Sequence, residues 1–211
     1  MVEIYILMKK EYRTIIFDLG GVIINLKKQN CIDAFKSLGY DTIENMLGEY
    51  KQGGEFLALE EGRLSPKEWR ESVRKNIASH VTDQQIDDAF NAFLVDIPVN
   101  KLRMLQTLKK SYRIAMLSNT NKVMFESKIP ELFKIDGLTM EDYFDEFFLS
   151  YKMGMSKPSE EIFIKVAEDL DINPNEALFI DDSQSNIDTA SKLGFQTMLV
   201  KPYTDFSDKL L

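Results

Sequence analysis

Short apolar runs alternate with longer amphipathic stretches along most of the chain, and the two patterns predict different elements. Thr14–Phe17 is a run of β-branched and aromatic residues, which is typical of a buried strand. The same criterion predicts further strands at 112–117, 147–150, 177–180 and 196–200. Between these runs, apolar residues recur every three or four positions, as in Leu102, Leu105 and Leu108, which indicates helices with one buried face.

From about residue 97 onward, the predicted strands and helices follow one another in strict alternation. Strands that are separated by a helical connection usually lie parallel in one sheet, with the helices covering its faces. We therefore expect an α/β protein with a Rossmann-like doubly wound parallel sheet, in which Thr14–Phe17 is the first strand.

The stretch between the first and second predicted strands contains helical patterns only. Helices are expected around residues 31–38, 46–50, 56–59, 66–77 and 83–93. The segment Ser65–Glu68 supplies an N-cap serine, a proline at the first helical position and a glutamate at the third, and Thr82 with Gln85 opens another helix in a similar way. The aromatic residues of this stretch are best explained as the core of a small helical bundle.

These patterns divide the chain into three parts. Residues 1–12 are expected to form an N-terminal extension, residues 13–26 together with 97–211 the α/β domain, and residues 27–96 an inserted all-helical subdomain. A chain of 211 residues is long enough for one domain with its own core and an insertion of this size.

Composition narrows the chemistry that the chain can carry. Cys31 is the only cysteine and His80 the only histidine, so a disulfide framework, a cysteine-based zinc site and a histidine-cluster metal site are all excluded. A catalytic triad that needs histidine is also disfavoured. Acid or base chemistry must therefore rest on carboxylates, lysine or a bound metal.

Charge and hydropathy bear on partners and location. The net charge of −8, with no basic block, would repel the phosphate backbone of a nucleic acid, so we expect no nucleic-acid partner. The apolar segment near the N-terminus is too short to span a membrane and lacks a basic flank, so we expect no membrane partner. Together with the single cysteine, this favours the cytoplasm. The oligomeric state stays open.

Polar residues that could take part in catalysis or metal binding lie at the ends of the predicted strands or at the start of the next helix. They are Asp18, Ser118, Lys157 and the pair Asp181-Asp182. Each of them alone would be read as a turn, a helix cap or a surface residue. Because the carboxyl ends of parallel strands meet at one edge of the sheet, where open α/β sheets bind ligands, we expect the whole set to converge.

The residue types in this set fit phosphoryl transfer. Carboxylate oxygens such as those of Asp18 and Asp182 suit Mg²⁺, which also accepts water and phosphate oxygens as ligands. A carboxylate can attack phosphorus and form an aspartyl-phosphate. Ser118 can donate a hydrogen bond to a phosphoryl oxygen, and Lys157 can neutralise negative charge. This reaction depends mainly on positioning and charge neutralisation.

The same segments resemble the four motifs of the haloacid dehalogenase-like (HAD) hydrolase superfamily, and the similarity covers nearly the whole chain from Arg13. The motifs are Asp18-Leu19-Gly20-Gly21-Val22, Ser118-Asn119, Lys157-Pro158 and Asp181-Asp182. The helical insertion is similar to the type 1 cap of this superfamily. Three segments resemble the branch that contains bacterial glucose-1-phosphate phosphatases, namely Ser118–Asn121, Leu149–Pro158 and Phe179–Ser183 together with Asn186.

The resemblance implies a function and a role for each matching residue. The activity would be a Mg²⁺-dependent phosphomonoester hydrolase acting on a small phosphorylated metabolite, such as a sugar phosphate. Asp18 would be the nucleophile, and Asp18, the main-chain carbonyl of Gly20 and Asp182 would hold the metal. The phosphate would be bound by Ser118, Asn119 and Lys157. Asp181 and Asn186 would lie behind the ligands or act through water.

Gly20 departs from the pattern of most phosphatases in the superfamily, which carry there an aspartate that protonates the leaving group and later activates water. Such a group contributes typically 10²–10⁴-fold to the rate. Members of the glucose-1-phosphate branch also have glycine at this position, so hydrolysis is still expected, with a preference for good leaving groups. Dehalogenases place an aromatic residue there and need no metal, so the resemblance argues against that chemistry.

Two other functions remain open from the sequence. The chain could be a phosphate- or metal-binding module that has lost catalysis at Gly20. A phospho-receiver domain uses similar residues, but it presents its acidic pair first and has no helical insertion after the first strand. Within the insertion, Glu60 and Arg63 lie near polar loops that would face a substrate, but charged residues in such loops are usually solvated, and we assign them no role.

Overall fold

The computed structural model describes residues 12–48, 52–78 and 80–211. Residues 1–11 of the predicted N-terminal extension and Tyr50 of the predicted second helix lie outside the described residues. Tyr12, the last residue of that predicted extension, is buried, and its ring centroid lies 5.6 Å from that of Tyr112.

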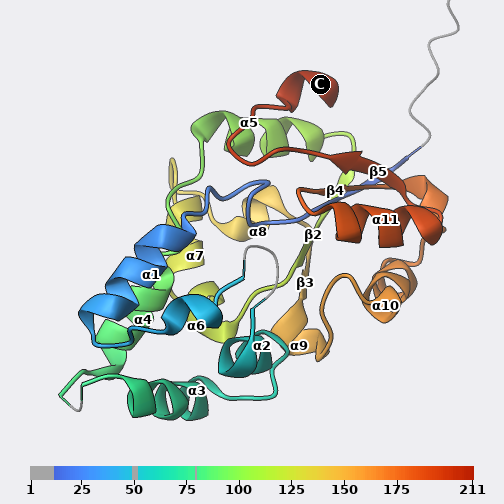
Figure 1. The fold of residues 1–211 in the computed structure, drawn as a ribbon. Helices are drawn as coiled ribbons and strands as arrows, with labels where there is room; N and C mark the ends of the chain where they lie inside the picture. The colour runs from blue at the N-terminus through green and yellow to red at the C-terminus, as the bar shows by residue number, and fades with distance from the viewer. Residues whose placement is uncertain (1–11, 49–51, 79) are drawn as a thin grey trace, which may run out of the picture.

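The described residues form a five-stranded sheet with the order β3-β2-β1-β4-β5, in which every pairing is parallel. Figure 1 shows this sheet with helices on both sides. The strands are β1 (Thr14–Phe17), β2 (Arg113–Ser118), β3 (Glu146–Leu149), β4 (Ala177–Asp181) and β5 (Gln196–Leu199). The predicted α/β fold is confirmed, and the predicted strands are correct to within one or two residues at their ends.

Alternating side chains of the central strands enter two separate hydrophobic clusters, as the two-residue period of a strand requires. Ile15 and Phe17 of β1 belong to one cluster together with α5 (Val99–Leu108), whereas Ile16 belongs to the other. That second cluster includes the apolar stripes of α10 (Glu160–Leu170) and α11 (Gln184–Lys192). The sheet is therefore buried on both faces, which explains why its strands are apolar runs rather than alternating patterns.

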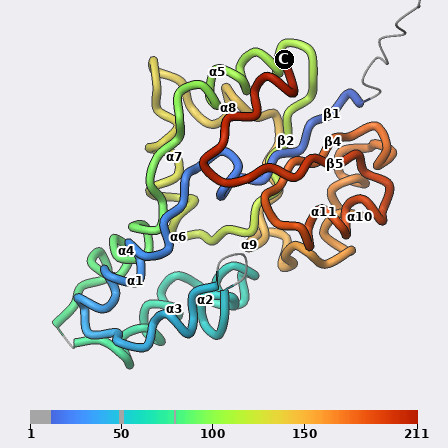
Figure 2. Tube along the Cα trace, turned by 45° about the horizontal axis from the view of Figure 1, so that its top comes forward, coloured from blue at the N-terminus to red at the C-terminus, as the bar shows by residue number. Residues whose placement is uncertain are grey.

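The insertion between β1 and α5 is helical, as predicted. Its helices are α1 (Lys28–Ser37), α2 (Gly54–Glu60), α3 (Pro66–Val73) and α4 (Asp83–Asn91). In Figures 1 and 2 these helices gather on one side of the sheet domain. The chain enters and leaves the insertion through adjacent segments, because Leu26 forms an antiparallel bridge with Leu94. The residue bounds proposed above for this subdomain stay a prediction.

Helix starts in the insertion follow the local sequence signals. The side chains of Ser65 and Thr82 each accept a hydrogen bond from the main-chain N–H three residues on. The side chains of Glu68 and Gln85 in turn accept a hydrogen bond from the N–H of the N-cap residue. Both capping boxes confirm the prediction from the sequence.

The predicted helix through Met46 and Leu47 is wrong over its described part. Only a 3₁₀ turn at Ile43–Asn45 forms there, and residues 46–48 are not helical. Gly48 follows the apolar pair directly, and glycine in a helix interior loses more conformational entropy than other residues, so two apolar residues do not sustain a helix. The helix expected to continue to Ile77 also ends earlier, at Val73, and is followed by a 3₁₀ turn.

Four aromatic rings, one from each of the helices α1 to α4, form the centre of the insertion. Phe56 lies edge-on to Phe35 and Trp69, with ring centroids 5.8 Å and 5.5 Å apart, and Trp69 lies 5.0 Å from Phe90. All four side chains are fully or almost fully buried. Edge-on and tilted arrangements of this kind are favourable for aromatic pairs. The aromatic residues therefore form the core of the helical bundle, as predicted.

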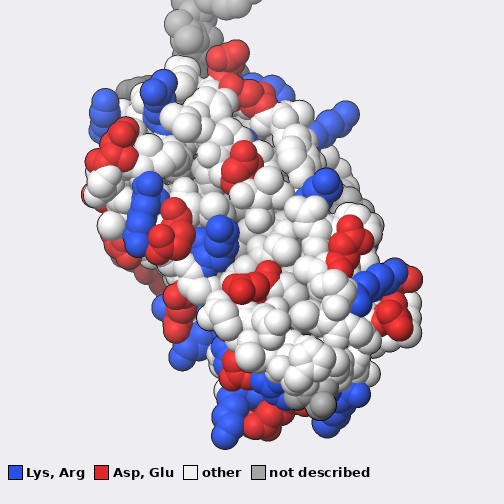
Figure 3. Space-filling model, turned by 90° about the vertical axis from the view of Figure 1, so that its left-hand side faces the viewer, with Lys and Arg blue, Asp and Glu red and all other residues white. Residues whose placement is uncertain are grey.

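The remaining helices are short. Residues 122–143 contain α6 (Lys122–Phe125), α7 (Lys128–Phe133) and α8 (Met140–Tyr143), and α9 (Ser150–Met153) follows β3 directly. In the part of the chain that the structure describes, no helix combines the length and apolar character needed to cross a bilayer. On the face drawn in Figure 3, acidic and basic side chains are intermixed rather than separated into large patches of one sign.

Candidate active site

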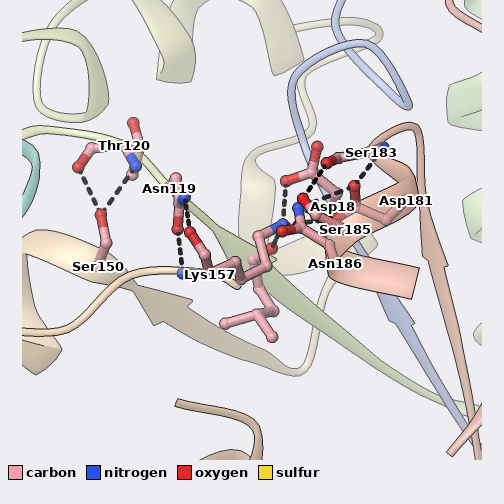
Figure 4. Close-up of polar contacts among 10 residues, drawn as sticks. Asp18, Asn119, Thr120, Ser150, Lys157, Asp181, Ser183, Ser185 and Asn186 are labelled. Atoms are coloured by element: carbon pink, nitrogen blue, oxygen red, sulfur yellow. Dashed lines mark hydrogen bonds and ion pairs between the residues drawn. The ribbon is translucent and has the colours of Figure 1, made fainter. Parts of the chain in front are cut away.

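Three strands deliver polar residues to the same edge of the sheet. Asp18 directly follows β1, Ser118 is the last residue of β2, and Asp181 is the last residue of β4. Because β1 lies between β2 and β4 and all three run parallel, these residues become neighbours, and the main-chain N–H of Asp18 donates to Ile180 O at 2.8 Å. The expected convergence at the carboxyl ends of the strands is present, and Figure 4 shows Asp18, Asp181 and Lys157 of this set close together.

Lys157 joins these strand ends through its side chain. Its Nζ donates to Asp18 Oδ1 at 2.7 Å, to Asp181 Oδ2 at 2.7 Å and to Leu117 O at 2.9 Å. An ammonium group has three hydrogens, so every donor of this buried side chain has an acceptor. The loop between α9 and α10 thereby brings a positive charge under the edge of the sheet.

Asn119 fixes the main chain of that lysine. The Asn119 side chain donates from Nδ2 to Lys157 O and accepts from Lys157 N at Oδ1, both at 2.9 Å. Figure 4 shows the two residues facing each other through this pair of bonds. This pair of bonds fixes the orientation of the Asn119 amide, and only one of the two Nδ2 hydrogens is used in it.

The two adjacent aspartates lie in different environments. Asp181 is fully buried, and its oxygens accept from Lys157, from the main-chain N–H of Ser183 at 2.8 Å and from Asn186 Nδ2 at 3.0 Å. Asp182 is partly exposed and lines the cavity described below. One carboxylate oxygen from each of Asp18, Asp181 and Asp182 lies within 4.8 Å of the other two. These are hard oxygen donors at a spacing that suits a divalent cation.

Burial and the neighbouring charges shift the pKa values of Asp18 and Lys157. Burial raises the pKa of Asp18 to about 7, Lys157 opposes this shift, and the nearby charges of Asp181 and Asp182 add to it. Burial by itself lowers the pKa of Lys157, but the carboxylates of Asp18 and Asp181 outweigh it and raise the pKa of this lysine. The carboxylates of Asp18 and Asp181 therefore stabilise the protonated form of Lys157.

Gly21, in the loop after Asp18, leaves room for the carboxylate of Asp182. Gly21 has φ +75°, and a Cβ at this position would overlap the Asp182 carboxylate. Gly20 has no such restriction, since a Cβ there would meet only the tip of the flexible Leu26 side chain, Cδ1 at 2.7 Å. The loop is also held by the buried Lys101, whose Nζ donates to Val22 O. Lys101 carried no signal in the sequence, because it looks like an ordinary surface lysine at a helix start.

A cavity of about 110 Å³ opens over these residues, between the sheet edge and the helical insertion. Its polar end is formed by Asp18, Ser118, Lys157, Asp182 and Asn186. The insertion and the segments next to it contribute apolar walls, formed by Ile24, Leu26, Phe90, Phe93, Leu94, Met124 and Ile129. The Ser118 hydroxyl makes no hydrogen bond with any described residue, so it can serve a ligand.

Ser150 connects the insertion to the site, a role that sequence reasoning missed. Its hydroxyl accepts from Thr120 N at 2.9 Å and contacts Glu60 O at 2.6 Å and Thr120 O at 2.9 Å. Thr120 lies two residues after Ser118, so one buried hydroxyl links α2 to the loop that follows β2. In the sequence Ser150 is the last residue of the strand predicted at 147–150, and nothing there indicates which segment its hydroxyl would bind.

The two charged residues of the insertion that were expected to be solvated behave differently from each other. Arg63 is exposed and pairs with Glu61, as expected. For Glu60 the expectation is wrong, because only 8% of this residue is exposed and it lines the cavity. The reason is tertiary, since the end of α2 docks on α9, where a Cβ on Gly62 would overlap Tyr151 O.

Comparison with known families agrees with this geometry. Residues 12–194 match the haloacid dehalogenase-like hydrolase family. The match spans most of the chain, and the chain therefore belongs to this family of hydrolases.

Individual relatives are similar over nearly their whole length. The chain is 34% identical over 198 residues to the D-ribitol-5-phosphate phosphatase of Bacteroides thetaiotaomicron, which covers 94% of this chain and 96% of the relative. A HAD family enzyme of the same organism, solved in complex with magnesium and inorganic phosphate, has a TM-score of 0.89 and 40% identity over 95% of this chain and 100% of its own. A HAD-like family hydrolase from Porphyromonas gingivalis has a TM-score of 0.88 and 37% identity, over 95% and 96% of the two chains.

The close approach of Gly21 and Asp182 gives a test of the loop. Gly21→Ala should destabilise the protein more than Gly137→Ala, which has a similar φ of +78° but no atom within 4 Å of the added methyl group. The left-handed backbone costs both variants roughly 1–2 kcal/mol, and the overlap with Asp182 should cost Gly21→Ala about 1–3 kcal/mol more. Urea denaturation of both variants measures the difference, and equal losses would contradict the structure of this loop.

Proposed function

We propose that the protein is a Mg²⁺-dependent phosphatase that hydrolyses a small phosphorylated metabolite through an aspartyl-phosphate on Asp18. The observation that carries this proposal is the buried contact of Lys157 with Asp18 and Asp181, next to Asp182 at the polar end of one cavity. This arrangement joins a carboxylate nucleophile, a fixed ammonium and oxygen donors for a metal, which are the parts that phosphoryl transfer needs.

The donor set fits Mg²⁺. Asp18, Asp182 and the main-chain carbonyl of Gly20 would hold the ion, because both oxygens of Asp181 already accept hydrogen bonds from protein groups. Asp181 and Asn186 would then support the ligands from behind or through water. The negative charges that raise the pKa of Asp18 also favour a cation at this point. When bound, the ion would neutralise charge on the phosphoryl group. Relatives solved with magnesium and inorganic phosphate support this assignment.

The protein groups around Asp18 have separable tasks. The Asp18 carboxylate attacks phosphorus, with Lys157 holding one of its oxygens and offsetting negative charge. The Ser118 hydroxyl, which has no partner among the described residues, donates to a phosphoryl oxygen. Asn119 fixes Lys157, and its second Nδ2 hydrogen or its main-chain N–H serves the phosphate. Each task uses a group whose position is set by a strand end or by buried hydrogen bonds.

The remaining polar atoms of the cavity favour a polyhydroxylated substrate. Gln52 Oε1 and Asn121 Nδ2 are buried and have no hydrogen-bond partner among the residues that the structure describes, and both residues line the cavity. A buried polar atom without a partner is costly, and substrate hydroxyl groups can supply both partners. A sugar phosphate or a sugar-alcohol phosphate has this character. The similarity to a D-ribitol-5-phosphate phosphatase supports the same class, whereas the glucose-1-phosphate branch stays a prediction.

One alternative rests on Gly20, which supplies no side chain for proton transfer. In that case the chain would bind Mg²⁺ and phosphate esters but turn them over slowly or not at all. Hydrolysis of a panel of phosphate esters, measured with and without Mg²⁺, separates the two functions. A cytoplasmic location is part of the main proposal, because the substrates it invokes are small metabolites.

The proposed nucleophile can be tested directly. Asp18→Asn should lower Mg²⁺-dependent phosphate release by at least about 10³-fold, because the amide cannot form the acyl-phosphate bond. The wild-type protein should also bind beryllium fluoride, which mimics a phosphorylated aspartate, and Asp18→Asn should not. Phosphate release and fluorine NMR measure the two effects.

Asp188→Asn is the matched control for this test, because Asp188 is exposed on α11 and its carboxylate accepts a hydrogen bond from the side chain of Gln184. It should keep full activity. Retained turnover in Asp18→Asn would remove Asp18 from the role of nucleophile, and absence of Mg²⁺-dependent hydrolysis in the wild type would favour the binding function.

The role of Gln52 in hydroxyl recognition gives a further prediction. Gln52→Ala should raise KM for a sugar-alcohol phosphate about 3- to 10-fold, which corresponds to the loss of one hydrogen bond of roughly 1 kcal/mol. For phenyl phosphate, which has no hydroxyl groups, KM should hardly change. Steady-state kinetics on both substrates test this, with the exposed Gln84→Ala of α4 as control. An equal change for both substrates would show that Gln52 only shapes the cavity.

A further inference from the structure

Hydrolysis of an alkyl phosphate requires a proton donor that the loop after Asp18 does not supply. The departing alkoxide is a strong base, so a positioned acid contributes typically 10²–10⁴-fold to the rate. Gly20 has no side chain, and Asp182 and Lys157 carry other tasks in the proposed function. The proton must therefore come from another group that lines the cavity.

The candidates among the described residues are few. The ionisable side chains that line the cavity there are Asp18, Glu60, Lys157 and Asp182. Three of them are committed to the nucleophile, the charge partner and the metal. Glu60 is left, and no hydrogen bond or ion pair connects its carboxyl group to any other described residue. It is an acidic group that is more than nine-tenths buried, lines the cavity and has no hydrogen-bond or ion-pair partner within the described part of the chain.

The position of Glu60 is fixed by its main chain rather than by its side chain. It is the last residue of α2, and its carbonyl oxygen is bound by the Ser150 hydroxyl, which also binds Thr120. This buried contact ties the end of α2 to the loop that carries Ser118. The carboxyl group is thus held at the cavity while remaining available to a ligand.

The protonation state of Glu60 matches the task of an acid. Burial raises the pKa of Glu60 to about 8, with a smaller contribution from the neighbouring charge of Glu61. The other ionisable groups that face the same cavity are Asp18, Asp182 and Lys157. At neutral pH the group is therefore mostly a neutral carboxylic acid, which is the form that donates a proton.

We propose that Glu60, delivered from the helical insertion, is the proton carrier of the reaction in place of the side chain that is missing at Gly20. This inference rests on the proposed phosphatase function. In the first step the bond between Asp18 and phosphorus forms, the bond between phosphorus and the alkyl oxygen breaks, and that oxygen keeps the electron pair and takes the proton of Glu60. The alcohol leaves, and Glu60 becomes a carboxylate.

The second step restores both groups. Glu60 takes a proton from a water molecule whose oxygen attacks phosphorus, and the bond between phosphorus and Asp18 breaks. Inorganic phosphate is released, Asp18 is again a carboxylate, and Glu60 is again neutral. A single side chain then acts as acid and as base, as the general principle of acid–base catalysis allows. The preference for good leaving groups expected from Gly20 should consequently appear only when Glu60 is removed.

The test compares a poor and a good leaving group in Glu60→Gln, which keeps the size of the side chain but cannot transfer a proton. Turnover of a sugar-alcohol phosphate should fall about 10²- to 10³-fold, because breaking the ester bond now lacks an acid. With 4-nitrophenyl phosphate the first step needs no acid, so a rapid burst of about one nitrophenolate per enzyme should precede slow turnover. Rapid-mixing kinetics detect the burst, which a merely structural role would not produce.

Two further variants make the result specific to Glu60. Glu61→Gln makes the same substitution at the next residue, which pairs with the exposed Arg63 and does not line the cavity, and it should keep nearly full activity. In the Glu60→Gln background, Gly20→Asp should restore turnover of the sugar-alcohol phosphate, because only the Leu26 tip must move to admit a side chain at this position.

The pH dependence supplies a separate readout. The acid form of Glu60 is lost as pH rises through about 8, so the rate with the alkyl ester should decline above that pH in the wild type and not in Glu60→Gln. Folding is checked by thermal unfolding at pH 9. There the variant should be no less stable than the wild type, since it avoids burial of a charged carboxylate.

The outcomes are distinct. Equal losses on both esters without a burst, or an unchanged rate in Glu60→Gln, would overturn the role of Glu60 while leaving the phosphatase intact. If the wild type hydrolyses neither ester with Mg²⁺, the proposed function itself fails, and this inference fails with it.

Discussion

The buried contact of Lys157 with Asp18 and Asp181 is the interaction on which the site depends. Three carboxylates at one sheet edge repel each other, and each of them loses hydration there, so the cluster needs a positive charge in contact with it. Lys157 supplies that charge. The Asn119 side chain holds the main chain of this lysine, and the carbonyl oxygen of Leu117 accepts a hydrogen bond from its Nζ. The ammonium binds only Oδ1 of Asp18, which orients this carboxylate. The second oxygen of Asp18 has no partner among the described residues.

The helical insertion adds to this site what the sheet cannot. Its aromatic core belongs to the same hydrophobic cluster as one face of the sheet, so the insertion is packed onto the domain through Phe90 and its neighbours. The contact of Ser150 with Glu60 and Thr120 places a second point of attachment directly beside the site. As a result the cavity is polar where it meets the strand ends and mainly apolar where it meets the insertion. Two buried polar atoms that line it, Gln52 Oε1 and Asn121 Nδ2, have no partner among the described residues.

Most of the fold was predictable because its determinants are local. The β-branched run Thr14–Phe17 and the capping boxes at Ser65 and Thr82 are recognisable within a few residues, and the structure contains all three. The candidate site was predictable for a related reason, since parallel strands bring Asp18, Ser118 and Asp181 to one edge whatever their distance in the chain. The helix predicted at Met46 was wrong, because two apolar residues beside a glycine do not outweigh the entropy lost on folding.

The sequence by itself therefore determined the order of the elements, the parallel sheet and the set of polar residues at its edge. Only the tertiary structure decided which of these residues contact each other and which segments of the insertion reach them. Glu60, Ser150 and Lys101 show the reason. The burial and the partners of these residues are produced by segments tens of residues away in sequence, so no local pattern of hydrophobic and polar positions could distinguish them from surface residues.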